Sequence, residues 1–346
     1  MKRLLLTLIC IALIFSGFLA VGKELPKLIS ITTFKVGSLG YTITSAFREA
    51  VERYTPMKVR VEPYGTDVAR ILPLKIGESE ITLATAPQAV SASYGLLNFS
   101  TDKWGPQPIR IVWRGMTLYV GCFVRADSDI QSYKDLKGKR VPVIPGSAAY
   151  KANMTAHLAF GGLTWDDVKQ VVCSSFMDVY EAFLGGKIDV VFSATSPPRL
   201  KEVVKSRHGA RWLPLPHSDQ AGWQRLQEAT PWNVPAVLKK GPGVKAGESV
   251  EMGSFAYSLY AYDHADDDVI HAYVMSMHKG YDTYKKMHKV LPLWSVEQAV
   301  TNPSPLPYHP GAIRYYKEAG VWTDKMDKWQ SEQIKSFNER LANWKK

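Results

Sequence analysis

Two serines lie in loops of small residues, each directly before a segment that is typical of a helix. Ser38 stands between two glycines in VGSLGYTITSAFREA, and Ser147 stands in IPGSAAYKANMTAHLAFGG. A serine in such a loop could act as a nucleophile if a base lay within hydrogen-bonding reach. Neither serine belongs to a Gly-x-Ser-x-Gly motif, and no histidine stands beside either of them in the sequence. A secreted serine hydrolase is therefore the lesser alternative.

The same two loops are well suited to hold an anion. Ile43, Phe47 and Ala50 recur at intervals of four and three residues, which predicts an amphipathic helix after the first loop. The first-turn amides of a helix have no partner inside it, and they point with the positive end of the helix dipole at the loop. Alternatively, the glycines only make the turn. We expect backbone amides and hydroxyls of two segments to hold an anion: Gly37, Ser38, Leu39, Gly40 and Tyr41, and Gly146, Ser147 and Ala148.

The N-terminus has the layout of a secretory signal. Lys2 and Arg3 precede an apolar run from Leu4 to Phe15, and small residues follow up to Gly22. The run is short for a membrane span, so an uncleaved anchor is the minor alternative. We predict a signal peptide over residues 1–22 and a periplasmic location.

Composition favours a globular protein that binds a small anion. Removing 22 of the 346 residues leaves 324, which is enough for two lobes, and losing Lys2 and Arg3 lowers the net charge from +11 to +9. The basic residues form no dense block, which argues against nucleic acid and favours an anionic solute. The remaining cysteines, Cys122 and Cys173, lie in apolar runs and are expected to be buried free thiols, with one disulfide as the alternative.

Two stretches of the chain share one pattern. In GTDVARILPLKIGESEITLATAPQ (65–88) and SFMDVYEAFLGGKIDVVFSATSPP (175–198), a helix ends at a glycine, an acid follows three residues later, and an apolar strand leads to Ala-Thr and proline. The acids are Glu80 and Asp189. The pattern predicts two similar α/β units, with chance resemblance as the alternative. In open α/β sheets ligands bind beyond the carboxyl ends of the strands, so two such edges that face each other would make a cleft.

Two segments could connect the lobes. Residues 108–128 contain two strand-like runs, and residues 247–263 contain another. We therefore expect lobe 1 to comprise residues 23–117 and 248–346, and lobe 2 to comprise residues 118–247.

Further polar residues follow the strands. Asp67 is expected to cap a helix that Pro73 keeps short or kinked. Arg114 could pair with a carboxylate through two hydrogen bonds, although a surface ion pair is the alternative. Loop position adds five second candidates: Gly65, Thr66, Gln88, Thr195 and Ser196.

We expect no metal and no cofactor. His264, His271 and His278 fall seven residues apart on one predicted helix, so neighbours lie roughly 10 Å apart, too far to share an ion. No Gly-x-x-x-x-Gly-Lys-Ser/Thr motif is present to cradle phosphate.

Several segments together resemble a known family. YKDLKGKRVPVIPGSAAYKANMTAHLAFGGLTWDDV, the strand GKIDVVF and the ending PLPYHPGAIRYYKEAGVW (305–322) are similar to the TAXI solute receptors of tripartite ATP-independent periplasmic (TRAP) transporters. The resemblance implies an α/β fold of the type II-like periplasmic binding protein class, with two lobes, a hinge and an interlobe ligand cleft. It implies capture of glutamate, 2-oxoglutarate or a related organic acid and delivery to a TRAP permease, without chemistry on the solute.

Two expectations complete this interpretation. The alternative within binding proteins is a receptor that feeds an ATP-driven transporter. We expect the receptor to be a monomer, and we expect Ser147→Ala to weaken carboxylate binding while scarcely changing folding.

Overall fold

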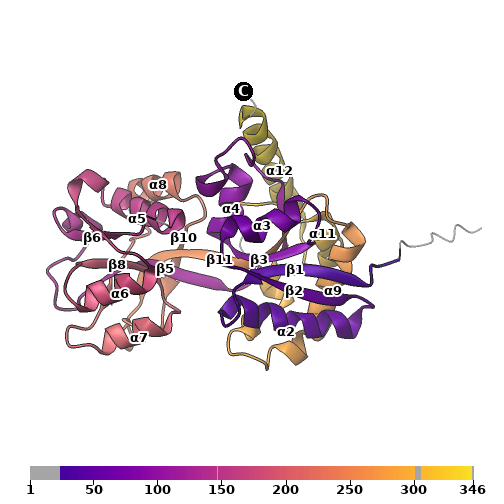
Figure 1. Ribbon diagram of the computed structural model, residues 1–346, viewed down its shortest axis with the longest axis horizontal. Helices are drawn as coiled ribbons and strands as arrows, with labels where there is room; N and C mark the ends of the chain where they lie inside the picture. The colour runs from indigo at the N-terminus through magenta and orange to yellow at the C-terminus, as the bar shows by residue number, and fades with distance from the viewer. Residues whose placement is uncertain (1–23, 146, 301–304, 345–346) are drawn as a thin grey trace, which may run out of the picture.

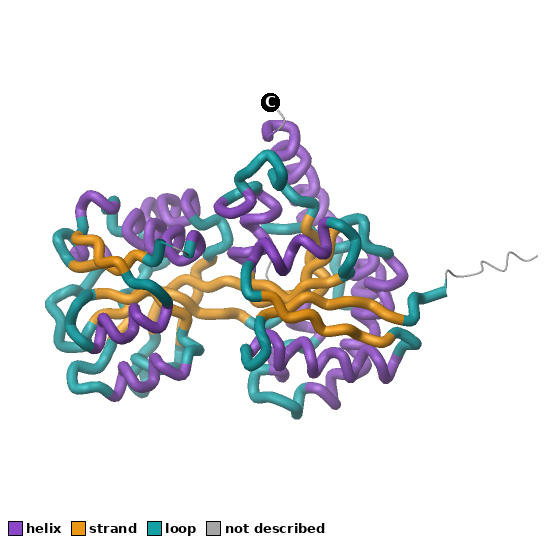
Figure 2. Tube along the Cα trace, in the orientation of Figure 1, coloured by secondary structure: helices purple, strands orange, loops and turns teal. Residues whose placement is uncertain are grey.

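The computed structural model describes residues 24–145, 147–300 and 305–344 of the chain. Figure 1 shows two lobes side by side, and Figure 2 shows strands that pass from one lobe into the other. The signal predicted over residues 1–22 lies outside the described residues. Within the described ranges, every helix is too short or too polar to span a bilayer.

Lobe 1 begins with three parallel strands that alternate with helices. Its first elements are β1 (Leu28–Phe34), α2 (Leu39–Tyr54), β2 (Lys58–Tyr64), α3 (Asp67–Lys75), β3 (Ile81–Thr85) and α4 (Ala86–Tyr94). β1 pairs in parallel with β2 on one side and with β3 on the other. Ile43, Phe47 and Ala50 are buried on one face of α2, so the predicted amphipathic helix is confirmed.

Lobe 2 repeats this order of elements. It contains β6 (Arg140–Val143), α5 (Ala148–Phe160), β7 (Lys169–Val172), α6 (Phe176–Leu184), β8 (Val190–Ala194), α7 (Pro198–Lys205), β9 (Arg211–Trp212), α8 (Gln220–Ala229) and β10 (Val234–Leu238). β6 and β7 form a parallel pair, and β8 pairs with β5. The helix α8 packs on α5.

Two paired strand paths connect the lobes. β11 (Val250–Tyr262) pairs with β10 and β5 (Thr117–Val124) in its first half and with β3 and β4 (Ile109–Trp113) in its second half. β4 and β5 pair in turn with the two halves of β11. Each predicted connection therefore follows one strand path, and the two paths run antiparallel to each other. The backbone N–H of Tyr257 donates to Met116 O across them (2.8 Å). One nine-stranded mixed sheet therefore extends through both lobes, and β6 and β7 form a separate two-stranded sheet.

The C-terminal helices cover lobe 1. They are α9 (Asp267–Tyr284), α10 (Val296–Ala299), α11 (Pro310–Glu318) and α12 (Asp324–Trp344), with short 3-10 turns elsewhere at Leu97–Phe99, Tyr133–Leu136, Trp165–Asp167 and Leu291–Leu293. α9 packs against both α2 and α11, and α12 contacts α4. The end of the chain therefore returns to the lobe in which the described part begins.

The predicted internal repeat has a structural counterpart in hydrogen bonding. In lobe 1 the Ser30 N–H donates to Glu80 Oε2 (2.7 Å) while the Glu80 N–H donates to Ser30 O (3.2 Å). In lobe 2 the Arg140 N–H donates to Asp189 Oδ2 (2.8 Å) while the Asp189 N–H donates to Arg140 O (2.9 Å). The acid after the glycine thus joins the first and third strands of both units, which favours true repetition over chance.

Three local predictions have different outcomes. Thr66, not Asp67, is the N-cap of α3, because its side chain accepts from the Ala69 N–H (3.2 Å) and Asp67 is already the first helical residue. Pro73 lies inside a helix of nine residues, so the prediction of a short helix is confirmed. Cys122 and Cys173 are buried and free, as expected, and no disulfide joins them.

Candidate ligand-binding site

Strand direction places the predicted loops at facing edges of the two lobes. Thr85, the last residue of β3, lies opposite Tyr257, so the carboxyl ends of β3 and its parallel neighbours point toward lobe 2. Ala194, the last residue of β8, lies opposite Val120 near the start of β5, so β8 ends toward lobe 1. These are the edges at which open α/β sheets bind ligands.

A serine caps the first helix at each of these edges. The side chain of Ser38 accepts from the Tyr41 N–H (3.1 Å), and that of Ser147 accepts from the Tyr150 N–H (3.3 Å). One first-turn amide of each helix is therefore already satisfied, which corrects the expectation that all of them are unpaired. The cap bond at Ser147 argues against the expectation that Ser147→Ala scarcely changes folding, since loss of an N-cap costs about 1 kcal/mol. The hydroxyl hydrogens can still donate to an anion.

The glycines of the first loop have different roles. Gly37 has a φ of +84° and open space around it, so it makes the turn. A Cβ at Gly40 would collide with the phenol oxygen of Tyr257 and the ring of Phe34, so Gly40 permits close packing at the crossing strands. Leu39 is the first residue of α2. Gly146 lies outside the described residues, and Ala148 begins α5.

The second candidates are mostly tied into the framework. Gln88 accepts from the Thr85 N–H (3.0 Å) and donates to Asp67 Oδ1 (2.6 Å), so it joins the starts of α4 and α3. The side chain of Lys35 lies against Gly65. The Thr195 N–H donates to Tyr119 O (3.0 Å), and Ser196 beside it is exposed.

Arg114 lies in the connection between β4 and β5. It is only 6% exposed, so the alternative of a surface ion pair is wrong. Its charge acts on the buried phenols of Tyr260 and Tyr308, whose pKa values burial raises and Arg114 lowers in part. Arg114 is thus a buried residue of the crossing itself, and a role in ligand binding stays a prediction.

Sequence reasoning missed Arg70. This arginine is 2% exposed, and its guanidinium lies 3.7 Å from the ring centroid of Phe34, the last residue of β1. Nη1 donates to Asp67 Oδ1 and Nη2 to Tyr64 O, both at 3.3 Å, while Nε has no partner among the described residues. The sequence does contain a sign of it: in the segment VARIL, an arginine stands among apolar residues that helix spacing places on a buried face.

Burial strongly affects the charges of this cluster. It lowers the pKa of Arg70, although Asp67 acts in the opposite direction. It raises the pKa of Asp67, although hydrogen bonds from Arg70 and Gln88 act in the opposite direction. Both ions are therefore poorly solvated, and each depends on its partners. A desolvated cation at this edge favours an additional anionic partner.

The equivalent edge of lobe 2 is aromatic. Phe176, the first residue of α6, has its ring centroid 5.7 Å from that of Tyr150 and 5.6 Å from that of Tyr180. Tyr150 in turn lies 5.9 Å from Phe192. Phe176 is 38% and Met177 53% exposed, so this edge presents apolar surface to solvent.

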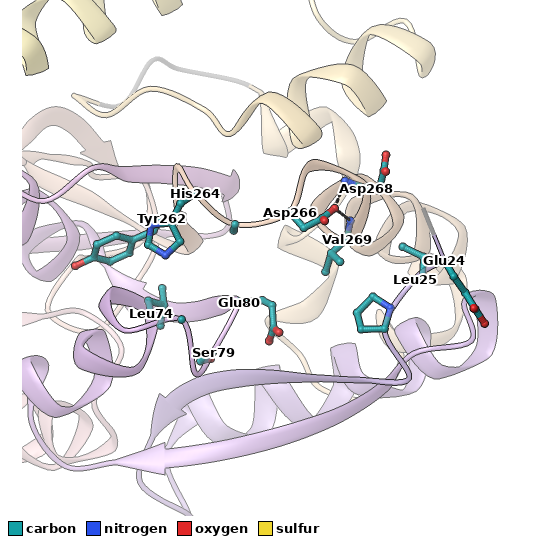
Figure 3. A pocket seen from close by; sticks show the side chains of 13 residues that line it. Glu24, Leu25, Leu74, Ser79, Glu80, Tyr262, His264, Asp266, Asp268 and Val269 are labelled. Atoms are coloured by element: carbon teal, nitrogen blue, oxygen red, sulfur yellow. Dashed lines mark hydrogen bonds between the residues drawn. The ribbon is translucent and has the colours of Figure 1, made fainter. Parts of the chain in front are cut away.

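The cavities found in the described structure are lined by other residues. One of about 420 Å³ lies at the amino ends of the lobe 1 strands, away from the crossing. Figure 3 shows Glu24, Glu80 and Asp268 among its lining side chains. Such a set of carboxylates is unsuited to an anion, so this cavity does not compete with the facing edges as the site for one.

The chain belongs to the NMT1-like family, whose model matches residues 31–320. The comparison does not confirm the TAXI branch. Among solved structures, the chain is similar to the periplasmic aliphatic sulphonate binding protein SsuA from Escherichia coli (15% identity, 92% of this chain and 89% of that one, TM-score 0.48). It is also similar to substrate binding domain 2 of GlnP from Lactococcus lactis (11%, 79% and 98%, 0.41) and to an ancestral arginine-binding protein bound to arginine (15%, 77% and 98%, 0.43). The expected α/β fold of two lobes is confirmed by the strands and helices described above.

Proposed function

We propose that this protein is an extracytoplasmic receptor that captures a small anionic solute between its lobes and delivers it to a membrane permease. The observation that carries the proposal is the facing of two repeated strand edges, each with a serine-capped helix start, across one pair of connecting strands. In this proposal the lobes comprise residues 23–117 with 248–346 and residues 118–247, and the residues before position 23 direct export to the periplasm.

A serine hydrolase has less support. Ser38 and Ser147 both use their side-chain oxygens to cap helices, and neither contacts a histidine in the described part of the chain. A nucleophilic serine needs a base within hydrogen-bonding reach. A receptor needs only the donors, which the capped hydroxyls retain.

Two classes of permease are candidates. The sequence resemblance favours a TRAP permease, and the alternative is an ATP-driven permease. We propose the ATP-driven class as the first partner to test and the TRAP class as the second. A gene for an ATPase beside this one would support it, and a gene for a fused TRAP permease would overturn it.

A thermal-shift screen of carboxylates and sulfonates tests the receptor function. A ligand present at about 100 times its dissociation constant adds roughly 2.7 kcal/mol to the free energy of unfolding, which raises the melting temperature measurably. Because a solute that touches both lobes favours the closed state, small-angle scattering with the best ligand should show a smaller radius of gyration. A scattering profile that does not change on saturation would contradict binding between the lobes.

A further inference from the structure

We propose that the solute is an oxyanion with an apolar body, whose head group binds Arg70 in lobe 1 and whose body packs on Phe176 and Met177 in lobe 2. The inference rests on the receptor function proposed above and names the class of its ligand. It predicts that the protein binds such a ligand in preference to glutamate and other polar dicarboxylates.

The repeat defines which positions of the two lobes are equivalent. Thr66 and Ser175 are the N-caps of α3 and α6, and each accepts from the N–H three residues later at 3.2 Å. The residue after the cap is Asp67 in lobe 1 and Phe176 in lobe 2. The same place at the strand edge therefore carries a charged pair in one lobe and an aromatic cluster in the other.

Arg70 has donors to spare at the lobe 1 edge. An arginine has five N–H groups, and the contacts to Asp67 and Tyr64 use one each. Nε is fully buried and has no partner among the described residues. An unpaired buried donor is costly, and an oxyanion that accepts from it would recover that cost.

Several cleft-edge elements meet at this guanidinium. Phe34 ends β1 and stacks on Arg70, and its ring lies 5.5 Å from that of Tyr257 on β11. Gly40, in the first turn of α2, packs against both of these rings. The positive end of α2 and the guanidinium thus both lie against Phe34, and both favour negative charge.

Asp67 is the carboxylate with which a bound anion would compete for Arg70. Its Oδ1 lies 3.3 Å from Arg70 Nη1 and also accepts from Gln88. Its side chain is 26% exposed, whereas that of Arg70 is 2% exposed, so solvent reaches the pair from the Asp67 side. Removing the Asp67 charge should therefore strengthen anion binding, which a purely structural role of the ion pair does not predict.

The lobe 2 edge suits an apolar body. Phe176 packs on Tyr150 and Tyr180, and the exposed parts of Phe176 and Met177 lie at the start of α6. Burying apolar surface from water is favourable in proportion to the area removed. A ligand that reaches from Arg70 to this pair gains from both lobes and favours closure.

Calorimetric titration of the full chain tests the preference with named probes. Phenylacetate, hexanoate and hexanesulfonate form the apolar series, and succinate, glutamate and 2-oxoglutarate form the polar series. We expect at least one member of the apolar series to bind roughly tenfold more tightly than every polar acid, the difference that about 1.4 kcal/mol of apolar burial gives. Tighter binding of the polar series would overturn the inference and leave the receptor function intact, whereas no binding by any probe would count against the receptor function itself.

Variants with matched controls test the residues. Arg70→Met should weaken the best apolar ligand roughly 10- to 100-fold, the range for hydrogen bonds to a charged group, and Phe176→Ala roughly tenfold. Arg110→Met is the control for the first, because Arg110 is also buried and ion-paired (3.3 Å to Asp263) but lies away from the facing edges. Leu184→Ala at the other end of α6 is the control for the second.

Asp67→Asn gives the answer if Arg70→Met does not fold. It keeps the shape of the side chain and removes the competing charge, so affinity for the best ligand should rise at least about fivefold. If Asp67→Asn bound the ligand equally or more weakly and Phe176→Ala bound it equally, neither the assignment of the head group to Arg70 nor that of the apolar body to Phe176 would stand.

Discussion

The two lobes repeat one hydrogen-bonding pattern around differently stabilised acids. Glu80 in lobe 1 is partly buried, and this burial raises its pKa although the Ser30 N–H acts in the opposite direction. Burial would also raise the pKa of Asp189 in lobe 2, but hydrogen bonds from the side chain and backbone of Arg140 outweigh it and lower the pKa. The repeat therefore places an acceptor at this position in both lobes, and only in lobe 2 is the pKa of the acid lowered.

The facing edges of the two lobes also differ in charge, but here lobe 1 carries the charged pair. Lobe 1 places the buried ion pair of Arg70 and Asp67 at its edge, whereas lobe 2 places Phe176 at the equivalent position. A repeated backbone can thus present different chemistry from each half. Lobe 2 has its charged pair, Arg140 and Asp189, in the framework, whereas lobe 1 has its charged pair, Arg70 and Asp67, at the candidate site.

The largest predicted effect is the loss of stability in acid that His157 of lobe 2 causes. This histidine is buried between the rings of Tyr133 and Phe192, and burial lowers its pKa to about 4 from 6.5. The folded state excludes a proton that the unfolded state binds, so the stabilisation is complete above pH 6.5 and is lost as pH falls toward 4. We expect the free energy of unfolding to fall by about 2 kcal/mol by pH 5 and about 3 kcal/mol by pH 4 from this group alone.

Urea unfolding of His157→Gln from pH 7.5 to 4 measures this contribution. The variant should lose that part of the pH dependence, whatever its stability at neutral pH. His309→Gln is the matched comparison in lobe 1, because burial also lowers the pKa of His309 to about 4, but Asp267 Oδ1 lies 3.5 Å from its Nδ1. An acid slope in His157→Gln equal to that of the natural chain would show that the histidine is not buried as described.

The repeated acids should respond unequally to loss of charge. Asp189→Asn should lower the free energy of unfolding at pH 7 by about 2 kcal/mol, because it breaks charged hydrogen bonds to Arg140, which is itself partly exposed. Glu80→Gln should change it by less than about 1 kcal/mol, because the amide oxygen can still accept from Ser30. Urea unfolding at pH 7 measures both.

The pH dependence of these two variants has opposite signs. Asp189 has a lowered pKa, so its stabilisation is present above its unfolded pKa and is lost as pH falls through the folded value. Glu80 has a raised pKa, so its contribution is greatest in acid and declines as pH rises through the folded value. Equal losses for the two variants at pH 7 would contradict the distinction between the lobes.

The two helix caps should respond equally to loss of their side-chain oxygens. Ser38→Ala and Ser147→Ala should each lower the free energy of unfolding by about 1 kcal/mol, because each removes the acceptor for one first-turn amide. Ser196→Ala is the control, since this serine is exposed beyond the end of β8 and should change stability by less than about 0.5 kcal/mol. A cost at Ser38 or Ser147 no larger than this control would mean that the cap bonds do not form in solution.

Much of the fold could be predicted from the sequence because it depends on local spacing. The buried face of α2, the glycine and acid pattern of the repeat, and the apolar runs of the crossing strands are all periodic signals within short segments. Ser38 and Ser147 could be placed at helix starts for the same reason. The cap at Thr66 was misassigned to Asp67, because two adjacent residues that both favour N-caps differ by one position that spacing does not resolve.

Local patterns in the chain specify the two repeated units, the strands that join them and the loops at their edges, since hydrophobic periodicity and turn residues act over a few neighbouring positions. Which side chains meet at these edges depends on how the segments pack. Arg70 contacts Phe34 at the end of β1 and Tyr64 at the end of β2, in addition to Asp67 in its own helix, and Arg114 is buried near Tyr260 and Tyr308, which are distant from it in sequence. Helix spacing encodes the pair of Arg70 and Asp67, but the burial of both arginines depends on the packing of separate segments.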